Sequence, residues 1–207
     1  MLKVLGRATS INVRKVLWLC EELGLPLERE DWGTPERPTS DAAFLAINPH
    51  GLVPVIRDGE FVLRESNTIC RYLAAAHGRT DLLPADPRGR AGVEQWMDWQ
   101  ATELNNAWRP AFMGLVRRHP AWQDAAAIAA GIEAWNAQMR LLDAQLARTG
   151  AWVTGGTFTL ADIVLGLAIN RWRLTPFDKP VLAAVQACEQ RLAPRPGWRL
   201  HGANGMP

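Results

Sequence analysis

The first part of the chain alternates short apolar runs with amphipathic segments. Leu2–Leu5 is typical of a strand, and the apolar positions that follow it at helical spacing predict a helix over 12–23. Gly24 and Pro26 then form a common helix stop. Residues 27–31 predict a second strand. This first unit therefore predicts two parallel strands joined by a right-handed crossover.

The next segment predicts a hairpin between two helices. Residues 41–47 predict a short helix, and a strand follows from Val53-Pro54. Asp58-Gly59 is a tight-turn signal, so the returning strand at 61–63 pairs in antiparallel. With a further helix after it, the order is β-α-β-α-β-β-α. The pattern predicts a mixed four-stranded sheet.

Residues 48–73 are also where a ligand is expected. Pro54 cannot donate to a sheet and belongs at an edge or a bend. If the bond before it is cis, the N–H and C=O of Val53 face outward and can pair with an extended ligand. Glu65 and Ser66 open a helix, whose first N–H groups attract a carboxylate. An edge strand beside such a helix start suits a small peptide with a free carboxylate.

The rest of the chain predicts helices. Residues 79–89 are rich in Gly, Pro, Asp and Arg, and Pro84 and Pro87 interrupt regular helix, which predicts a linker. Beyond it, apolar side chains repeat at steps of three and four, which predicts buried helical stripes. One stripe runs through Ile128, Ile132, Trp135, Met139, Leu142 and Leu146.

A capping box is predicted at the start of one later helix. Thr159 precedes Asp162 by three residues, so each side chain can reach the other's backbone N–H. Phe158 and Ile163 are placed to form the accompanying hydrophobic staple. We expect Asp162 to serve folding rather than substrate binding.

Composition narrows the class of protein. The chain has 207 residues, 48% of them hydrophobic and 21% charged, as in ordinary globular proteins. A net charge of +2 gives no reason to expect nucleic acid, and no apolar run is long enough for a membrane helix. Cys20, Cys70 and Cys188 lie in apolar helical patterns and predict buried, reduced thiols. These features predict a cytoplasmic protein without a metal.

The 48–73 segment resembles the glutathione-binding part of the glutathione S-transferase family, whose run there is NPxGxVPxL…L.ES..I..YL. The matching residues are Asn48, Pro49, Gly51, Val53, Pro54, Val55, Leu63, Glu65, Ser66, Ile69, Tyr72 and Leu73. The Thr159–Asp162 element resembles the opening of a core helix in the same family. The resemblance implies a thioredoxin-like domain at 1–78, a linker at 79–89 and an all-helical domain at 90–207. It also implies glutathione as co-substrate.

In this family the group that activates the glutathione thiol lies just before the first helix and is Tyr, Ser or Cys. Tyr72 is the only tyrosine and lies in a later helix, while Cys20 lies too far along the first helix. Ser10, four residues before Arg14, is similar to the serine-type, theta-like pattern. Asn12 is similar to a related bacterial group that uses Thr-x-Asn. The resemblance makes Ser10 and Asn12 the catalytic candidates, although Ser10 also suits a simple helix cap.

The resemblance also implies roles in glutathione binding. Val53, beside Pro54, is expected to pair with the cysteinyl unit through its backbone. Glu65 is expected to meet the γ-glutamyl ammonium and Ser66 its carboxylate. His50 lies near the expected glycyl end, where Leu52 replaces the basic residue of some relatives.

A second, hydrophobic substrate is expected between the domains, against the first long helix. The predicted wall comprises Trp99, Thr102, Glu103, Asn106, Arg109 and Met113, together with Trp108 and Phe112. Trp99 and Arg109 also suit the interface of a homodimer, which the resemblance implies.

Three functions stay open at this point. The first is transfer of glutathione to small hydrophobic electrophiles. The second is glutathione-dependent reduction of disulfides or peroxides, and the third is a non-catalytic interaction module of the same fold. An isomerase of the maleylacetoacetate type is a weaker fourth, because its Ser-Ser-Cys pattern is absent.

Overall fold

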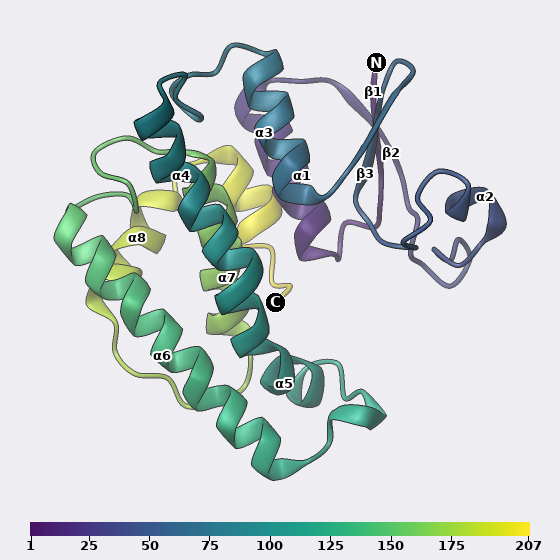
Figure 1. Ribbon diagram of the computed structural model, residues 1–207. Coiled ribbons are helices and arrows are strands. Elements are labelled where there is room, and N and C mark those ends of the chain that lie inside the picture. The colour runs from purple at the N-terminus through teal and green to yellow at the C-terminus, as the bar shows by residue number, and fades with distance from the viewer.

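A sheet covered by helices makes up the first part of the protein, and the second part is built of helices alone (Figure 1). The computed structural model describes residues 1–207. The elements of the first part are β1 (Leu2–Leu5), α1 (Ile11–Leu23), β2 (Leu27–Glu30), α2 (Ala42–Leu45), β3 (Val55–Asp58), β4 (Phe61–Arg64) and α3 (Ser66–Ala76). Their order is the predicted β-α-β-α-β-β-α.

The sheet has the strand order β2-β1-β3-β4. β1 pairs in parallel with β2 and in antiparallel with β3, which pairs in antiparallel with β4. This mixed four-stranded sheet confirms the thioredoxin-like first domain. The α1 helix supplies the crossover between β1 and β2, and α3 packs beside α1 (Figure 1).

Local turn signals produced the expected geometry. Gly24 ends α1 in the left-handed region at φ 63°, and Gly59 turns the hairpin at φ 59°. The Val53-Pro54 bond is cis. Because Pro54 has no N–H to donate, β3 begins at Val55, two residues later than the sequence predicted.

Residues 77–86 form no helix or strand and lead into the second part. Its helices are α4 (Pro87–Trp99), α5 (Asn105–Leu115), α6 (Ala125–Thr149), α7 (Leu160–Leu174) and α8 (Ala183–Leu192). Shorter turns are a π-helical turn at Gln100–Leu104, a 3-10 turn at Pro120–Trp122 and a second π-helical turn at Trp198–Gly202. The all-helical second domain is thus confirmed, while its boundaries at 79–89 and 90–207 stay a prediction.

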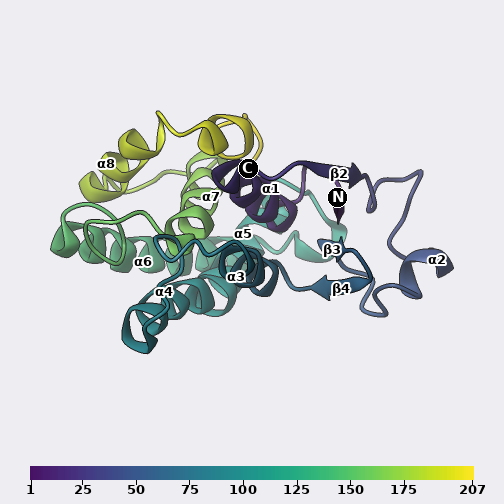
Figure 2. The ribbon, with the colours of Figure 1, turned by 90° about the horizontal axis from the view of Figure 1, so that it is seen from above.

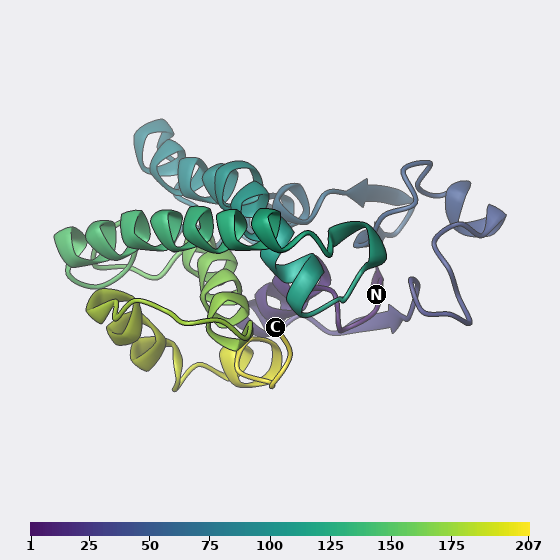
Figure 3. The same ribbon diagram turned by 90° about the horizontal axis from the view of Figure 1, so that it is seen from below.

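One hydrophobic core joins the two parts through α1, which lies between the sheet and the later helices (Figure 2). Trp18 of α1 is fully buried, with its ring 5.6 Å from the Trp198 ring and 6.4 Å from the Phe158 ring. A Cβ at Gly197 would lie 2.1 Å from Trp18 Cδ1, so only glycine fits there. The C-terminal segment returns beside α1 and α7 (Figure 3).

The predicted capping box at the start of α7 is present. Asp162 Oδ2 accepts the Thr159 N–H at 2.9 Å and its hydroxyl at 3.0 Å. Asp162 Oδ1 accepts the Val153 N–H at 3.0 Å. Phe158 and Ile163 are both buried. The Asp162 carboxylate therefore ties the loop before α7 to the helix itself.

Candidate active site

The first turn of α1 presents polar groups that the chain does not use itself. Ser10 precedes α1 with φ −80° and ψ 125°, and its side chain forms no capping hydrogen bond. Its carbonyl accepts the Arg14 N–H at 2.9 Å, so the backbone alone starts the helix. Asn12, in the same turn, is exposed. The Ser10 hydroxyl and the Asn12 amide are available to a ligand.

Three hollows meet at Asn12 and form one trough. The widest, of about 540 Å³, has Ser10 and Val53 in its wall. A second, of about 180 Å³, reaches Glu65 and Ser66. A third, of about 90 Å³, lies between them and includes Pro54. The residues that the trough brings together are Ser10, Asn12, Val53, Pro54, Glu65 and Ser66.

Val53 offers an unpaired stretch of backbone to the trough. Neither its N–H nor its C=O forms a hydrogen bond within the chain, although β3 begins two residues later. A Cβ at Gly6 would lie 2.5 Å from Val13 Cγ2 and 3.1 Å from Val53 Cβ. Glycine is therefore required where the loop after β1 passes Val53. This close approach sets the unpaired edge beside the start of α1.

The other end of the trough is the start of α3. Glu65 adopts φ 70° and ψ 110°, a conformation that few residues other than glycine take up. Such strain concentrates at ligand-binding sites, and here it leaves the Glu65 side chain exposed in the trough. Ser66 is the first helical residue, where unpaired backbone N–H groups favour an anion. This end thus offers a carboxylate for a cation and a helix start for an anion.

Lys15 is a site residue that the sequence did not point out. Its Nζ donates to Gln100 Oε1 at 2.7 Å and to Asn67 Oδ1 at 3.3 Å, and it lines the same hollow as Ser66. Burial lowers the pKa of Lys15 to about 8, so it carries a positive charge at neutral pH. The only sequence signal was a lysine inside an apolar helix. Lys15 adds positive charge to the end of the trough that favours an anion.

The π-helical turn decides which residues of the long helix reach the trough. The Asn105 N–H donates to the Gln100 carbonyl five residues earlier, and Gln100, Ala101 and Asn105 line the hollow. The eight residues predicted for the second-substrate wall line none of the three hollows: Trp99, Thr102, Glu103, Asn106, Trp108, Arg109, Phe112 and Met113. Their assignment stays a prediction.

Two residues near the expected glycyl end differ in placement. His50 is exposed, donates its N–H to Asn48 Oδ1 at 3.2 Å and lines none of the three hollows. Leu52, 61% exposed, lines two of them. The trough wall beside Leu52 also includes Arg7, which sequence reasoning did not consider.

The cysteines lie outside the trough. All three are free and buried, as predicted, and burial raises the pKa of each thiol to about 12. They are therefore protonated and unreactive at neutral pH. No group of three or more His, Cys, Asp or Glu side chains is arranged to hold a metal ion. None of the helices has the length and apolar character needed to cross a membrane.

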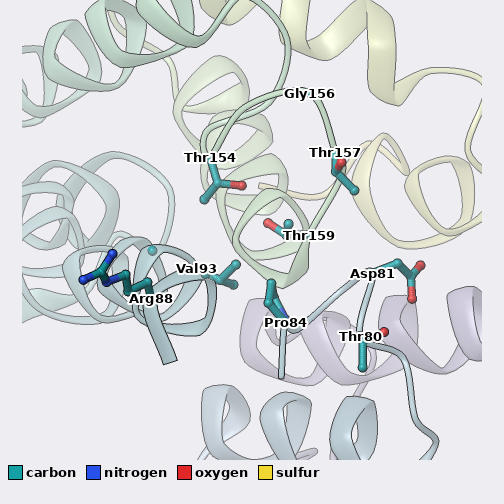
Figure 4. Close-up of a pocket in the computed structure, with 11 residues that line it drawn as sticks. Thr80, Asp81, Pro84, Arg88, Val93, Thr154, Gly156, Thr157 and Thr159 are labelled. Atoms are coloured by element: carbon teal, nitrogen blue, oxygen red, sulfur yellow. The ribbon is translucent and has the colours of Figure 1, made fainter. Parts of the chain in front are cut away.

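A separate hollow of about 510 Å³ opens between the residues after α3 and the loop before α7 (Figure 4). Thr80, Asp81, Arg88, Thr154 and Thr157 are among its walls. It shares no residue with the trough. We assign it no part in the chemistry.

A thioredoxin-like domain, a helical domain and a trough suited to a small peptide define a two-domain peptide-binding protein. Comparison with known families specifies it further. A family model described as the glutathione S-transferase N-terminal domain matches residues 5–81, and one described as the C-terminal domain of the same enzymes matches residues 125–201. The chain belongs to the glutathione S-transferase family. It is an enzyme of that activity, with glutathione as its co-substrate.

Individual relatives agree over nearly the whole chain. The chain is 46% identical to glutathione S-transferase GstB of Escherichia coli K12, over 96% of each sequence. It is 34% identical to glutathione S-transferase 3 of Zea mays, over 96% of this chain and 91% of the relative. Among solved structures, the theta class enzyme of Xanthomonas axonopodis pv. citri, with glutathione bound, matches with a TM-score of 0.90 and 37% identity. That match covers 98% of this chain and 97% of the other.

Proposed function

We propose that the trough holds glutathione extended along the Val53 edge, with its sulfur beside Ser10. The observation that carries this proposal is the continuity of the three hollows around Asn12. An open helix start, an unpaired strand edge and a second helix start follow one another along it. The γ-glutamyl end would lie at Glu65 and Ser66 and the glycyl end near Leu52. His50 would be a more distant neighbour of that end.

The Ser10 hydroxyl would donate a hydrogen bond to the sulfur, and Asn12 would offer a second donor. A hydrogen bond to the charged form of an acid lowers its pKa. The glutathione thiol would lose its proton to solvent, and the thiolate would attack the electrophilic carbon. The carbon–sulfur bond then forms as the leaving group departs with its electron pair. Because every protein thiol is buried and protonated, the thiolate of bound glutathione would be the nucleophile.

The second substrate would be a small hydrophobic electrophile bound between the trough and the long helix α4–α5. Trp99, Thr102, Glu103, Asn106, Arg109 and Met113 would form or border its wall. Because these side chains lie off the trough, some of them would serve the outer part of that cleft or a subunit contact.

The protein would act as a homodimer in the cytoplasm. Phe61 is 48% exposed and Val62 43% exposed on β4, the edge strand of the sheet. The Phe61 ring lies 5.2 Å from the Tyr72 ring of α3. This apolar edge would pack on the helices of a second subunit. Free, buried cysteines agree with a reducing compartment.

Titration of bound glutathione tests the role of Ser10. The ultraviolet absorbance of the thiolate, followed against pH, gives the thiol pKa in the complex. Ser10→Ala should raise that pKa by one unit or more, since one unit corresponds to about 1.4 kcal/mol. The affinity for glutathione, measured by calorimetry, should change little.

Thr9→Ala is a matched control, because Thr9 is an exposed neighbour that lines none of the three hollows. An unchanged thiol pKa in Ser10→Ala, with a raised one in Asn12→Ala, would move the role to Asn12. Calorimetry without any heat of glutathione binding would contradict the whole assignment of the trough.

A further inference from the structure

Four arginines near the first turn of α1 have no acidic partner. They are Arg7, Arg14, Arg117 and Arg171, and no carboxylate forms an ion pair with any of them. Seven other arginines do form ion pairs with acids, and Arg195, for example, lies 2.6 Å from Glu22. An unpaired charge is costly to bury unless something else neutralises it. The cluster therefore calls for an anion that the chain does not supply.

Arg171, near the end of α7, is the clearest case. It is only 3% exposed, yet its guanidinium forms no hydrogen bond and its Nε is buried without a partner. Burial and the nearby charges of Arg14 and Arg117 lower its pKa to about 9. The guanidinium still carries its charge at neutral pH. Five N–H donors on a fixed planar group are thus left for a ligand.

Aromatic rings of α5 surround this charge. The Arg171 guanidinium carbon lies 4.5 Å from the centre of the Trp108 ring and 4.2 Å from that of Phe112. The exposed Arg117 places its own guanidinium carbon 5.5 Å from the same Phe112 ring. One ring therefore lies against two cations with no acid between them. Cation–π contacts hold both groups in place but do not neutralise them.

Arg14 differs from these two because oxygens of the segment 204–207 accept hydrogen bonds from its two terminal nitrogens. It donates to the carbonyls of Met206 at 2.8 Å and Pro207 at 3.0 Å, and to Asn204 Oδ1 at 3.2 Å. Arg7 likewise donates to the Gly33 carbonyl. The Nε atoms of Arg7 and Arg14 have no partner either, but Arg117 and Arg171 are the two members of the cluster whose guanidinium groups form no hydrogen bond at all.

The cluster lies close to the proposed reaction centre. The Arg14 N–H binds the Ser10 carbonyl, and α7, which carries Arg171, packs directly against α1. A ligand held by Arg171 and Trp108 would therefore lie next to the first turn of α1, where the thiolate is expected.

We propose that Arg117 and Arg171, with the rings of Trp108 and Phe112, bind the anionic group of the second substrate. That substrate is then an electrophile with an apolar body and a carboxylate or sulfonate. The inference rests on the proposed function, because it places this group beside the glutathione sulfur. The rings hold the body, and the two guanidinium groups bind the anionic group.

A pair of aryl chlorides tests this directly: 4-chloro-3,5-dinitrobenzoate and its methyl ester. In both, the thiolate forms a bond to the ring carbon, and chloride leaves with the bonding electrons. Only the acid carries the anionic group. We expect Arg171→Met to lower kcat/KM for the acid by about tenfold or more, as for loss of a charge-assisted hydrogen bond. Turnover of the ester and the KM for glutathione should stay within about twofold of the unmodified protein, by the same reasoning.

Two further variants keep the test decisive. Arg117→Met removes an exposed side chain, so it keeps the inference testable even if Arg171→Met does not fold, and it should raise the KM for the acid alone. Arg173→Met, also on α7 but paired with Glu189 at 2.9 Å, should change neither substrate.

Each other outcome counts against the inference in its own way. Equal losses for acid and ester would mean that the arginines act on the thiolate. A raised KM for glutathione would mean that they bind the glycyl carboxylate of glutathione instead. If the unmodified protein transfers glutathione to the ester but does not prefer the acid, the inference falls while the proposed function stands. If it converts neither compound, both fall.

Discussion

Two helix starts in this protein carry similar polar side chains and use them in opposite ways. At the start of α7, the Asp162 carboxylate is buried and accepts hydrogen bonds from Val153 and Thr159. At the start of α1, Ser10 forms no capping bond and Asn12 is exposed. At the start of α7 the polar side chains thus bond within the chain, and we call it the closed start. At the start of α1 they have no partner within the chain, and we call it the open start.

The difference separates stability from function. A hydrogen bond made within the chain stabilises the fold, whereas a donor left unpaired keeps its capacity for a ligand. The strained Glu65 and the unpaired backbone of Val53 belong with the open start of α1. Substitutions at the start of α7 should therefore change the free energy of unfolding, whereas substitutions around the start of α1 should change the binding or the thiol pKa of glutathione.

The largest expected effect is on stability, at the closed start. Asp162→Ala leaves the buried N–H groups of Val153 and Thr159 without acceptors, at a cost of about 3 kcal/mol. Urea unfolding would show this loss as a lower midpoint, with the thiol pKa of bound glutathione unchanged. Asp86→Ala is the control: its side chain caps α4 at the exposed Gly89 N–H, 2.8 Å away, and should cost about 1 kcal/mol. Equal losses of stability in Asp162→Ala and Asp86→Ala would show that the buried contacts of Asp162 stabilise the fold no more than an exposed cap does.

Lys15 should give the protein a stability that depends on pH. Its folded pKa of about 8 lies below the ordinary value of 10.5, so between these pH values the unfolded chain binds more protons. The free energy of unfolding should then rise with pH across this window, by about 2–3 kcal/mol. Lys15→Met should remove that rise. Parallel stability curves for the two proteins from pH 8 to 10 would show that Lys15 is not buried as a cation.

Glu65→Gln should weaken glutathione binding about tenfold, because an amide cannot balance the γ-glutamyl ammonium; that factor is about 1.4 kcal/mol. Stability should change little, since Glu65 is exposed. Calorimetry measures the first effect and urea unfolding the second. Glu60→Gln, an exposed glutamate in the hairpin, is the control. The same weakening in both variants would point to a general charge effect.

The smallest expected effect is on the fold at the open start. Ser10→Ala should change the free energy of unfolding by less than about 0.5 kcal/mol, because no capping bond is lost. Asp124→Ala, which removes a cap that accepts the Ala126 N–H at 2.8 Å, should cost about 1 kcal/mol. If Ser10→Ala cost as much, Ser10 would be a structural cap.

Sequence reasoning succeeded where the signal was local. Gly24, the Asp58-Gly59 turn and the Thr159–Asp162 box each act within a few residues, so their structures follow from their side chains alone. Val53, Pro54, Glu65 and Ser66 also come together in the trough, because the hairpin and α3 follow one another along the chain; their role in glutathione binding stays a prediction.

It failed where the cause lay far away in sequence. Lys15 can be buried because Gln100, 85 residues later, accepts a hydrogen bond from its ammonium group. Arg171 meets Trp108 only once α5 and α7 are packed together. Sequence reasoning also missed the change in rotation between α4 and α5, for another reason: nothing in the residues around Gln100–Leu104 indicates a π-helical turn.

Because of this π-helical turn, the side of α5 that faces Arg171 depends on the number of residues in the turn as well as on the side chains of α5. Each residue of an α-helix advances it by about 100°. Removing one residue from Gln100–Leu104 would restore regular α-helix and rotate α5 by about that angle relative to α4. Trp108 and Phe112 would then turn away from Arg171, and other side chains would take their place. A single insertion or deletion here would thus exchange the residues of α5 that face α7 and would also shift Gln100, Ala101 and Asn105 in the wall of the trough.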